Sequence, residues 1–386
     1  MHGLAAWAAS MPGIRPLLKL SFAVQNALGS GPASFHALNV AIHAANAVLV
    51  WLLLERRNQF AAAVAAIVFA LDPVQTEAVT YVSGRSTSLA ALFALGSLVA
   101  WERGHVHVLS PLLFALGLAV KEYVIVVPLA IVLGDSFRNP GRASRLLPHL
   151  AIVVAAAIAA IASPSYRLLL ATSMSIRSIG ANLAAQSVAI PYLARQAVRP
   201  DLLNADPRLP ATGSWIVGIA IVLLLALGIA SLRRRPAIAF GILWFFLWLA
   251  PTNSFLPRFD VVNDREIYVA LIGPAWILGV ALARIASDRA RLAAAATLAI
   301  VLGTATARRN EVYLSETAFW SDVVRKSPEN ARAWSNLGYA QALAGDAISA
   351  DSSFVHALAL DPGFVRAAVN LKLLRAGALT DGAPHP

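Results

Sequence analysis

The chain has 386 residues, of which 58% are hydrophobic and only 13% are charged, and its formal net charge is +11. Soluble globular proteins carry about 25% charged residues, so this composition excludes an ordinary soluble domain and indicates an integral membrane protein. The chain contains no cysteine, which excludes disulfides, thiolate nucleophiles and cysteine metal sites.

The first 34 residues are expected to form an outer-face segment. The opening MHGLAAWAASMPGIRP lacks a basic segment followed by a long apolar run, and Pro12 and Pro16 interrupt it. This pattern is neither a signal peptide nor a membrane span.

Apolar segments recur through residues 35–307. Several are shorter than the roughly 20 residues that cross about 30 Å of hydrocarbon, so we expect them to recruit flanking residues or to end at a wet cavity. The sequence predicts an all-α fold, a polytopic membrane helix bundle of about ten spans: Phe35–Leu54, Phe60–Leu71, Ser86–Trp101, Val106–Val120, Tyr123–Gly134, Leu147–Ala162, Trp215–Leu232, Ala237–Ala250, Ile267–Ala283 and Leu292–Ala307.

Short arginine-rich connections alternate with longer, arginine-poor ones. Under the positive-inside rule the rich connections face the cytoplasm, and the polar connections at 72–85, 163–213 and 251–266 face outside together with both chain ends. A chain that starts outside without a signal peptide is hard to insert, so we expect a further span upstream of Met1. The arginine-rich connections hold Glu55–Arg57, Glu102–Arg103, Arg138 to Arg145, Arg233–Arg235 and Arg284 to Arg291.

The polar tail, residues 308–386, repeats with a 34-residue period. Trp320 and Phe354 are 34 residues apart, and so are Pro328 and Pro362, which is the tetratricopeptide period. The clearest repeat is 331–364, in which Trp334, Leu337, Gly338, Ala350, Phe354, Ala357 and Pro362 fit the motif. The tail is therefore predicted to form a short α-solenoid.

Four polar side chains in the first span share one helix face, because they recur at spacings of three and four residues. Lipid would penalise this face, so it points into the bundle, either for hydrogen bonds between helices or as part of a cavity wall. The residues are His36, Asn39, His43 and Asn46. No acid shares this stripe, so a metal site is not indicated.

Three further polar patches fall on the outer side. They are DPVQTEAVTYVSGR (72–85), the pair Lys121-Glu122, and the segment from Pro251 to Tyr268, which contains Arg265. Each could be structural, as a connector, an ion pair or a proline-braced turn. Charged groups at membrane depth are usually functional, however, and three such patches at one face suit a substrate with an apolar tail and an anionic head.

The motifs RPL at Arg15–Leu17, FHALNVAIH at Phe35–His43, DPVQTEAVTYVSGR, VKE at Val120–Glu122 and APTNSFLPRFD…NDREIYVALIG resemble the transmembrane and tetratricopeptide-repeat (TMTC-type) O-mannosyltransferases. The departure is Asp72, where that family usually has histidine. The resemblance implies a GT-C-like fold and transfer of a sugar, mannose, from a polyprenyl-phosphate donor to a serine or threonine of a protein, or to another acceptor. The alanine- and arginine-rich, cysteine-free composition suggests a bacterium, so the expected location is the inner membrane with periplasmic repeats, or the endoplasmic reticulum membrane if the protein is eukaryotic.

Roles follow from this resemblance. Lys121, Arg265 and Arg85 are candidates for the donor phosphate, and Glu77 and Glu122 are the candidate catalytic or positioning carboxylates. No Asp or Glu precedes Glu55, so the principal catalytic acid is expected upstream of Met1. A divalent metal remains open as a cofactor, since no metal-ligand spacing is visible. The expected partners are the lipid-linked sugar, the acceptor, the bilayer and a protein bound by the repeats.

Two other classes of function stay open. A non-catalytic membrane scaffold would use the bundle as an anchor and the repeats for recruitment. A transporter would show internal repeats and polar groups at the midplane, and neither is evident.

Overall fold

The computed structural model describes residues 15–29, 31–135, 143–209 and 213–379, so the first 14 residues of the predicted outer-face segment 1–34 and the loop arginines Arg138 and Arg142 lie outside the described residues. All regular elements in these ranges are helical. They form two compact units, one made of the described residues up to Pro200 and from 213 to Thr306, and the other of residues 201–209 together with those from Ala307 onward.

Each predicted apolar segment is helical in the first unit. Its longer helices are α2 (Pro16–Ala27), α3 (Pro32–Leu54), α4 (Gln59–Leu71), α6 (Arg85–Glu102), α7 (Leu109–Val120), α8 (Val127–Asp135), α9 (Leu147–Ala162), α10 (Pro164–Ile176), α11 (Ile179–Gln196), α12 (Trp215–Ala230), α13 (Pro236–Leu249), α15 (Ile272–Leu282) and α16 (Asp288–Glu311).

Four helical stretches in the described residues are long and apolar enough to cross a membrane, and up to seven if each bent helix pair counts as one span. The bent pairs are Gln59–Leu71 with Pro73–Val79, Pro164–Ile176 with Ile179–Gln196, and Asp264–Ala270 with Ile272–Leu282. The protein is thus a helical membrane protein, and the count of ten spans stays a prediction. Residues 164–196 were expected to be an outer loop but form α10 and α11.

Local chemistry sets several helix boundaries. Asn58 caps α4 by accepting a hydrogen bond from the Ala61 N–H at 2.8 Å. The helix ends at Leu71 and Asp72 is extended, because the following Pro73 has no amide hydrogen and disfavours helical geometry before it. The carboxylate of Asp72 then accepts from the Val74 N–H at 3.0 Å and starts the short turn η1 (Pro73–Gln75).

The bundle interior combines glycine contacts with aromatic packing. Gly241 of α13 and Gly273 of α15 face each other so closely that a Cβ on either would overlap the carbonyl oxygen of the other. Trp244 and Trp248 pack at 5.5 Å between ring centroids, and Trp244 donates to the carbonyl oxygen of Val269 at 2.8 Å. Small residues at a membrane helix contact let the backbones approach, which replaces the missing hydrophobic driving force.

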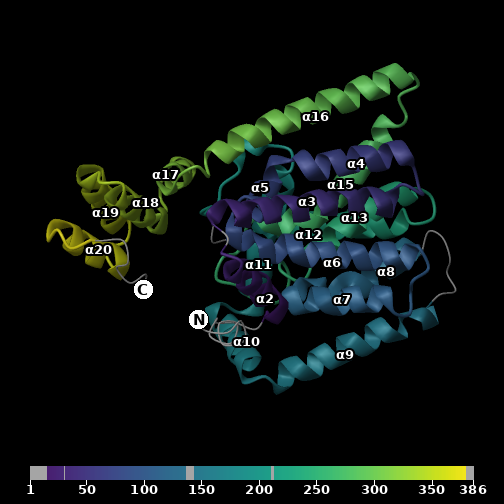
Figure 1. Ribbon diagram of the computed structural model, residues 1–386, viewed down its shortest axis with the longest axis horizontal. Coiled ribbons are helices and arrows are strands. Elements are labelled where there is room, and N and C mark those ends of the chain that lie inside the picture. The colour runs from purple at the N-terminus through teal and green to yellow at the C-terminus, as the bar shows by residue number, and fades with distance from the viewer. Residues whose placement is uncertain (1–14, 30, 136–142, 210–212, 380–386) are drawn as a thin grey trace. The chain divides into compact units, whose positions relative to one another are not determined.

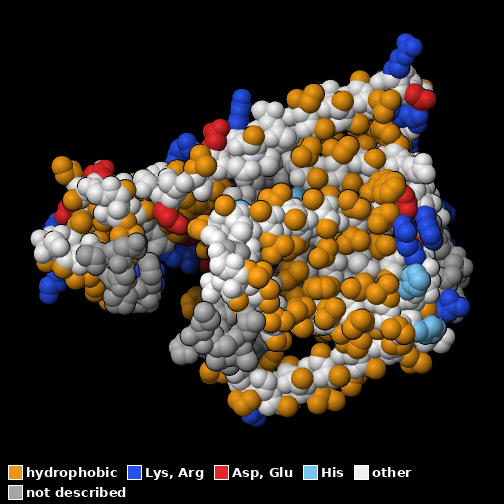
Figure 2. All heavy atoms as spheres, in the orientation of Figure 1, with side chains coloured by type: hydrophobic (Ala, Val, Ile, Leu, Met, Phe, Trp, Pro, Cys, Tyr) orange, Lys and Arg blue, Asp and Glu red, His pale blue; other side chains and the backbone are white. Residues whose placement is uncertain are grey.

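The connections of the first unit gather at its two ends (Figure 1). At one end, Arg57 pairs with Glu102 at 3.2 Å and Arg103 with Glu55 at 3.4 Å, which joins the α3–α4 and α6–α7 connections. The short helix α5 (Thr76–Val79) lies at the opposite end with α10 and α11. Between the ends, the face shown in Figure 2 is covered by hydrophobic side chains, as expected for a surface in contact with lipid.

The second unit contains α17 (Glu316–Lys326), α18 (Ala331–Leu343), α19 (Ala347–Leu360) and α20 (Val365–Arg375). Ala350, Phe354 and Ala357 of α19 are buried and pack with Trp334 of α18, as the repeat pattern requires, although the tetratricopeptide assignment itself stays a prediction. Residues 201–209 were expected to belong to the membrane domain (35–307), but they pack with this tail.

Candidate functional site

A groove of about 880 Å³ lies at the end of the first unit that carries α5, α10 and α11. It is lined by α2, by the connection after α7, by α10 and by the loop after α13. One part of its wall is apolar and another part is strongly basic, so the groove is amphiphilic. The lining residues that carry the argument are Arg15, Lys19, Lys121, Glu122, Arg258 and the apolar set Leu18, Phe22, Ile125, Leu169, Leu170 and Leu256.

Lys121 stands at the centre of the basic part. It follows the C-terminus of α7 in an extended conformation, and its ammonium donates to Thr87 Oγ1 of α6 at 2.7 Å. Burial lowers the pKa of Lys121 well below its usual value, the positive charges of Arg15, Arg265 and Arg258 lower it further, and the charge of Glu122 opposes them. Arg15, Lys121 and Arg258 line one groove, and an anion bound among them would reduce the mutual repulsion of their charges.

Glu122 is the acidic residue among the groove's described lining residues, and Arg15 holds it. The Arg15 guanidinium donates through Nε to one carboxylate oxygen at 3.2 Å and through Nη2 to the other at 2.8 Å. Tyr166 of α10 donates to Oε1 at 3.3 Å. Burial raises the pKa of Glu122, but the hydrogen bond and charge of Arg15 outweigh burial and hold this pKa below its usual range.

Glu77 and Arg265 are brought together from positions 188 residues apart. Glu77 accepts from the Arg265 backbone N–H at 2.9 Å, and the Arg265 guanidinium lies 3.7 Å from its carboxylate. The neighbouring Arg258 pairs with Glu266, whose side chain is buried. Glu77 therefore fixes the loop that carries Arg258 into the groove, rather than lining the groove itself.

The stretch at 72–85 folds as three short helical elements, η1, α5 and η2 (Val82–Gly84). Gln75 donates to the carbonyl oxygen of Tyr268 at 3.2 Å. Gly84 lies so close to the carbonyl oxygens of Glu77 and Ala78 that a Cβ there would overlap them. The polar side chains of this stretch thus hold neighbouring segments in place and do not line the groove.

Arg85 does not line the groove. It is fully buried, donates through Nε to Asn39 Oδ1 at 2.8 Å and through Nη2 to the carbonyl oxygen of Phe35 at 3.2 Å. Its guanidinium lies 4.3 Å from the centroid of the Phe22 ring, and Phe22 does line the groove. Arg85 is thereby placed behind the wall as a packing residue.

The polar stripe of α3 is engaged in hydrogen bonds between helices. Asn39 donates to the carbonyl oxygen of Val79 at 3.2 Å. His43 Nε2 lies 3.2 Å from the carbonyl oxygen of Ala70 and must donate to it, so Nδ1 accepts from the Tyr268 hydroxyl at 2.7 Å. His36 is exposed. None of these three described residues is part of the groove lining; Asn39 and His43 make interhelical contacts, whereas the exposed His36 departs from the expectation that the whole stripe points into the bundle.

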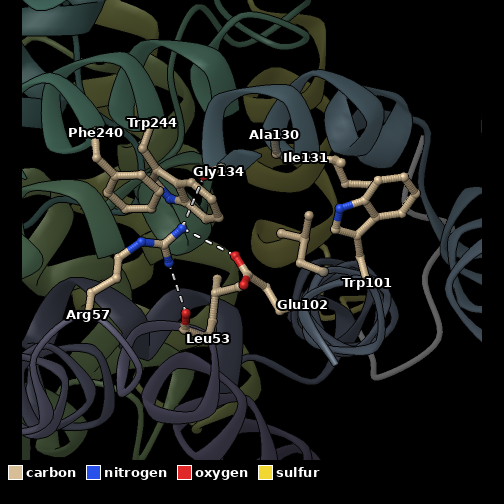
Figure 3. A pocket seen from close by; sticks show the side chains of 10 residues that line it. Leu53, Arg57, Trp101, Glu102, Ala130, Ile131, Gly134, Phe240 and Trp244 are labelled. Atoms are coloured by element: carbon tan, nitrogen blue, oxygen red, sulfur yellow. Dashed lines mark hydrogen bonds and ion pairs between the residues drawn. The ribbon is translucent and has the colours of Figure 1, made fainter. Parts of the chain in front are cut away.

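The opposite end of the unit is closed by a separate ion pair (Figure 3). Arg57 donates to Glu102 at 3.2 Å and to the carbonyl oxygen of Leu53 at 3.0 Å, and its guanidinium lies 5.3 Å from the centroid of the Phe240 ring. The cavity at this place is only about 10 Å³, too small for an organic ligand. At this place the helices are therefore packed without room for a ligand.

The described residues contain no group of three or more histidine, cysteine or acidic side chains that could hold a metal ion. The residues of the groove that sequence reasoning missed are Arg15, Tyr166 and Arg258. The sequence could have indicated the two arginines, because they lie beside Pro16 and Pro257 in the motifs at 15–17 and 251–258. The sequence offered no signal for Tyr166, since it falls in a segment expected to be a loop.

The fold and the groove together define a helical membrane protein with an amphiphilic, basic site at one end. The chain is 35% identical over 94 residues to mouse "Protein O-mannosyl-transferase TMTC3" and 37% identical over 93 residues to mouse "Protein O-mannosyl-transferase TMTC1". Each alignment covers 23% of this chain and 10% of the relative's length. No family model and no solved structure matches. The similarity supports a TMTC-like relationship over that segment.

Proposed function

We propose that the protein is a membrane glycosyltransferase that moves a sugar from a polyprenyl-phosphate carrier to an acceptor hydroxyl on the non-cytoplasmic face. The observation that carries this proposal is the groove, which joins an apolar wall to a cluster of cations. The similarity to O-mannosyltransferases makes mannose the first sugar to test and a serine or threonine hydroxyl the first acceptor.

The groove suits a lipid phosphate in shape and in charge. Leu18, Leu169 and Leu170 would contact the first isoprene units, because they line the groove beside its basic part. Lys121 and Arg258 would hold the phosphate, which becomes more negative as the sugar leaves and is therefore bound more tightly in the transition state. Arg265 does not line the groove, but its positive charge acts on Lys121, and its contact with Glu77 fixes its position.

The groove carboxylate fits the role of general base. Glu122 can reach a hydroxyl in the groove, whereas Glu77 is bound to Arg265. A base that accepts the hydroxyl proton raises the nucleophilicity of the acceptor oxygen by about 10²–10⁴ in rate. We therefore assign base function to Glu122 and a positioning function to Glu77.

The test uses the purified full chain in lipid nanodiscs with polyprenyl-phosphate mannose. Lys121→Met should weaken donor binding by about tenfold or more, since it removes a charge-assisted contact. Arg56→Met is the matched control, because it removes the same charge from an exposed side chain at the opposite end. Donor binding without sugar release or transfer would favour the scaffold alternative, and equal loss in both variants would contradict the assignment of the groove.

A further inference from the structure

The contact between Arg15 and Glu122 engages the proposed base with a cation that lines the same groove. Arg15 directly precedes α2, and Glu122 follows α7, 107 positions later. Both side chains are partly exposed, 38% and 39%, and both line the groove. The pair is therefore open to a ligand rather than sealed in the core, unlike Arg57 and Glu102 at the opposite end, which are 14% and 12% exposed.

We propose that donor binding switches Arg15 from Glu122 to the lipid phosphate and thereby releases Glu122 to act as the base. This inference rests on the proposed function. In the empty groove, the carboxylate is bound at both oxygens by a planar guanidinium, the geometry that Arg uses equally well for a phosphate. A phosphate offers the same fork a denser negative charge, so the two anions compete for one cation.

After the exchange, Glu122 and the phosphate-bound Arg15 would each keep polar neighbours in the groove. Tyr166 continues to donate to Glu122 Oε1 and would keep the carboxylate aimed into the groove. Lys121 and Arg258 border the same space, so a phosphate that recruits Arg15 would meet three cations. A carboxylate that loses an adjacent cation becomes more basic, which couples base strength to the presence of donor.

The chemical step then balances without another reactant. The acceptor oxygen attacks the anomeric carbon, and the bond from that carbon to the phosphate oxygen breaks with its electron pair going to the phosphate. Glu122 takes the proton of the acceptor hydroxyl. Without donor, Arg15 keeps Glu122 a weak base.

The first experiment measures equilibrium binding of polyprenyl phosphate, which has no sugar to transfer, to the full chain in nanodiscs. Glu122→Gln should tighten binding by about tenfold, because Arg15 no longer has a competing anion. In the Arg15→Gln background the same change should have no effect. A gain that persists in that background would show a general charge effect and would overturn the exchange.

The second experiment follows the Glu122 carboxylate by infrared difference spectroscopy as polyprenyl phosphate is added. We expect its band to shift in the wild-type protein, to be absent in Glu122→Gln and to be already shifted in Arg15→Gln. Tyr166→Phe provides a second assignment of the same band, since it removes the hydrogen bond to Oε1.

The arms of this experiment separate the two proposals. Inorganic phosphate reports the headgroup alone and neutral polyprenol the tail alone. If polyprenyl phosphate binds and the carboxylate band does not move, the exchange is refuted and the proposed function stands. If polyprenyl phosphate does not bind at all, the proposed function fails together with the inference.

Discussion

Arg85 was expected to bind the donor phosphate, but the structure places it among packing contacts. Its charge suggested a phosphate ligand, but its side chain is buried between Asn39, the Phe35 carbonyl and the Phe22 ring. A buried cation costs free energy unless hydrogen bonds and aromatic faces compensate it. Arg85 therefore connects α6 to α3 and holds the wall of the groove in place.

Substitution of Arg85 by lysine should destabilise the protein while leaving the charge of the groove unchanged. Lysine lacks the planar fork that reaches both acceptors, so we expect a loss of about 2 kcal/mol in unfolding free energy. Thermal unfolding in detergent measures this change, with the exposed Arg56→Lys as control. Unaltered stability together with weaker donor binding would instead support Arg85 as a ligand of the donor phosphate.

The types of residue at the site could be predicted from the sequence, but their pairing could not. Lys121 and Glu122 stood out because charges are rare beside apolar runs. That Glu122 meets Arg15, and Glu77 meets Arg265, depends on contacts over 107 and 188 positions, which no local spacing encodes. For the same reason, the stripe of α3 could be placed on one helix face, but its partners Val79 and Tyr268 could not be identified.

At the scale of elements, periodicity and apolar length predicted the helices of the bundle well. They failed for residues 164–196, since α10 and α11 bend by 77° where they meet and neither reads as a complete span alone. These two helices are nevertheless important, because α10 supplies Tyr166 and one apolar wall of the groove. A long polar-looking outer segment in such a chain is therefore worth testing for broken spans.

Close glycine contacts should set the packing of α13 against α15. Gly273→Ala would place a Cβ into the carbonyl group of Gly241, so we expect a loss of about 1–3 kcal/mol in stability through overpacking. Gly303→Ala in α16 meets no described atom within 4 Å and should be neutral or slightly stabilising. Melting temperatures of the two variants in one detergent compare them, and equal values would argue against the contact.

At the scale of the molecule, the second unit depends on a buried charge cluster. Asp322 is 4% exposed and pairs with Arg309 at 2.7 Å and with Lys326 at 2.7 Å. Burial raises the pKa of Asp322, but the hydrogen bonds and charges of Lys326 and Arg309 lower it below its ordinary value. A carboxyl whose pKa is lower in the folded state stabilises the fold at neutral pH, and this contribution is lost as the pH falls.

The second unit should therefore loosen on acidification below about pH 4, the ordinary range for aspartate. Amide hydrogen exchange of α17 and α18, measured across that range, reports this change. Asp322→Asn should exchange faster already at neutral pH, because Arg309 is then buried without its carboxylate, and its exchange should depend less on pH. An identical pH profile in wild type and variant would exclude Asp322 as the source.

The loop at 201–209 has a consequence for how the chain crosses the bilayer. Lys326 donates to the carbonyl oxygen of Leu203, Asn204 to Ser327 Oγ and Asn330 to the carbonyl oxygen of Asp206, so this loop and the tail form one folded body. A single body cannot be divided by a membrane. The stretch between Gly213 and Thr306 must then begin and end on the same side, which requires an even number of crossings within it. Of its helices, α16 is long and apolar enough to span, α15 belongs to a bent pair that could form one span, and α12 and α13 are shorter apolar helices.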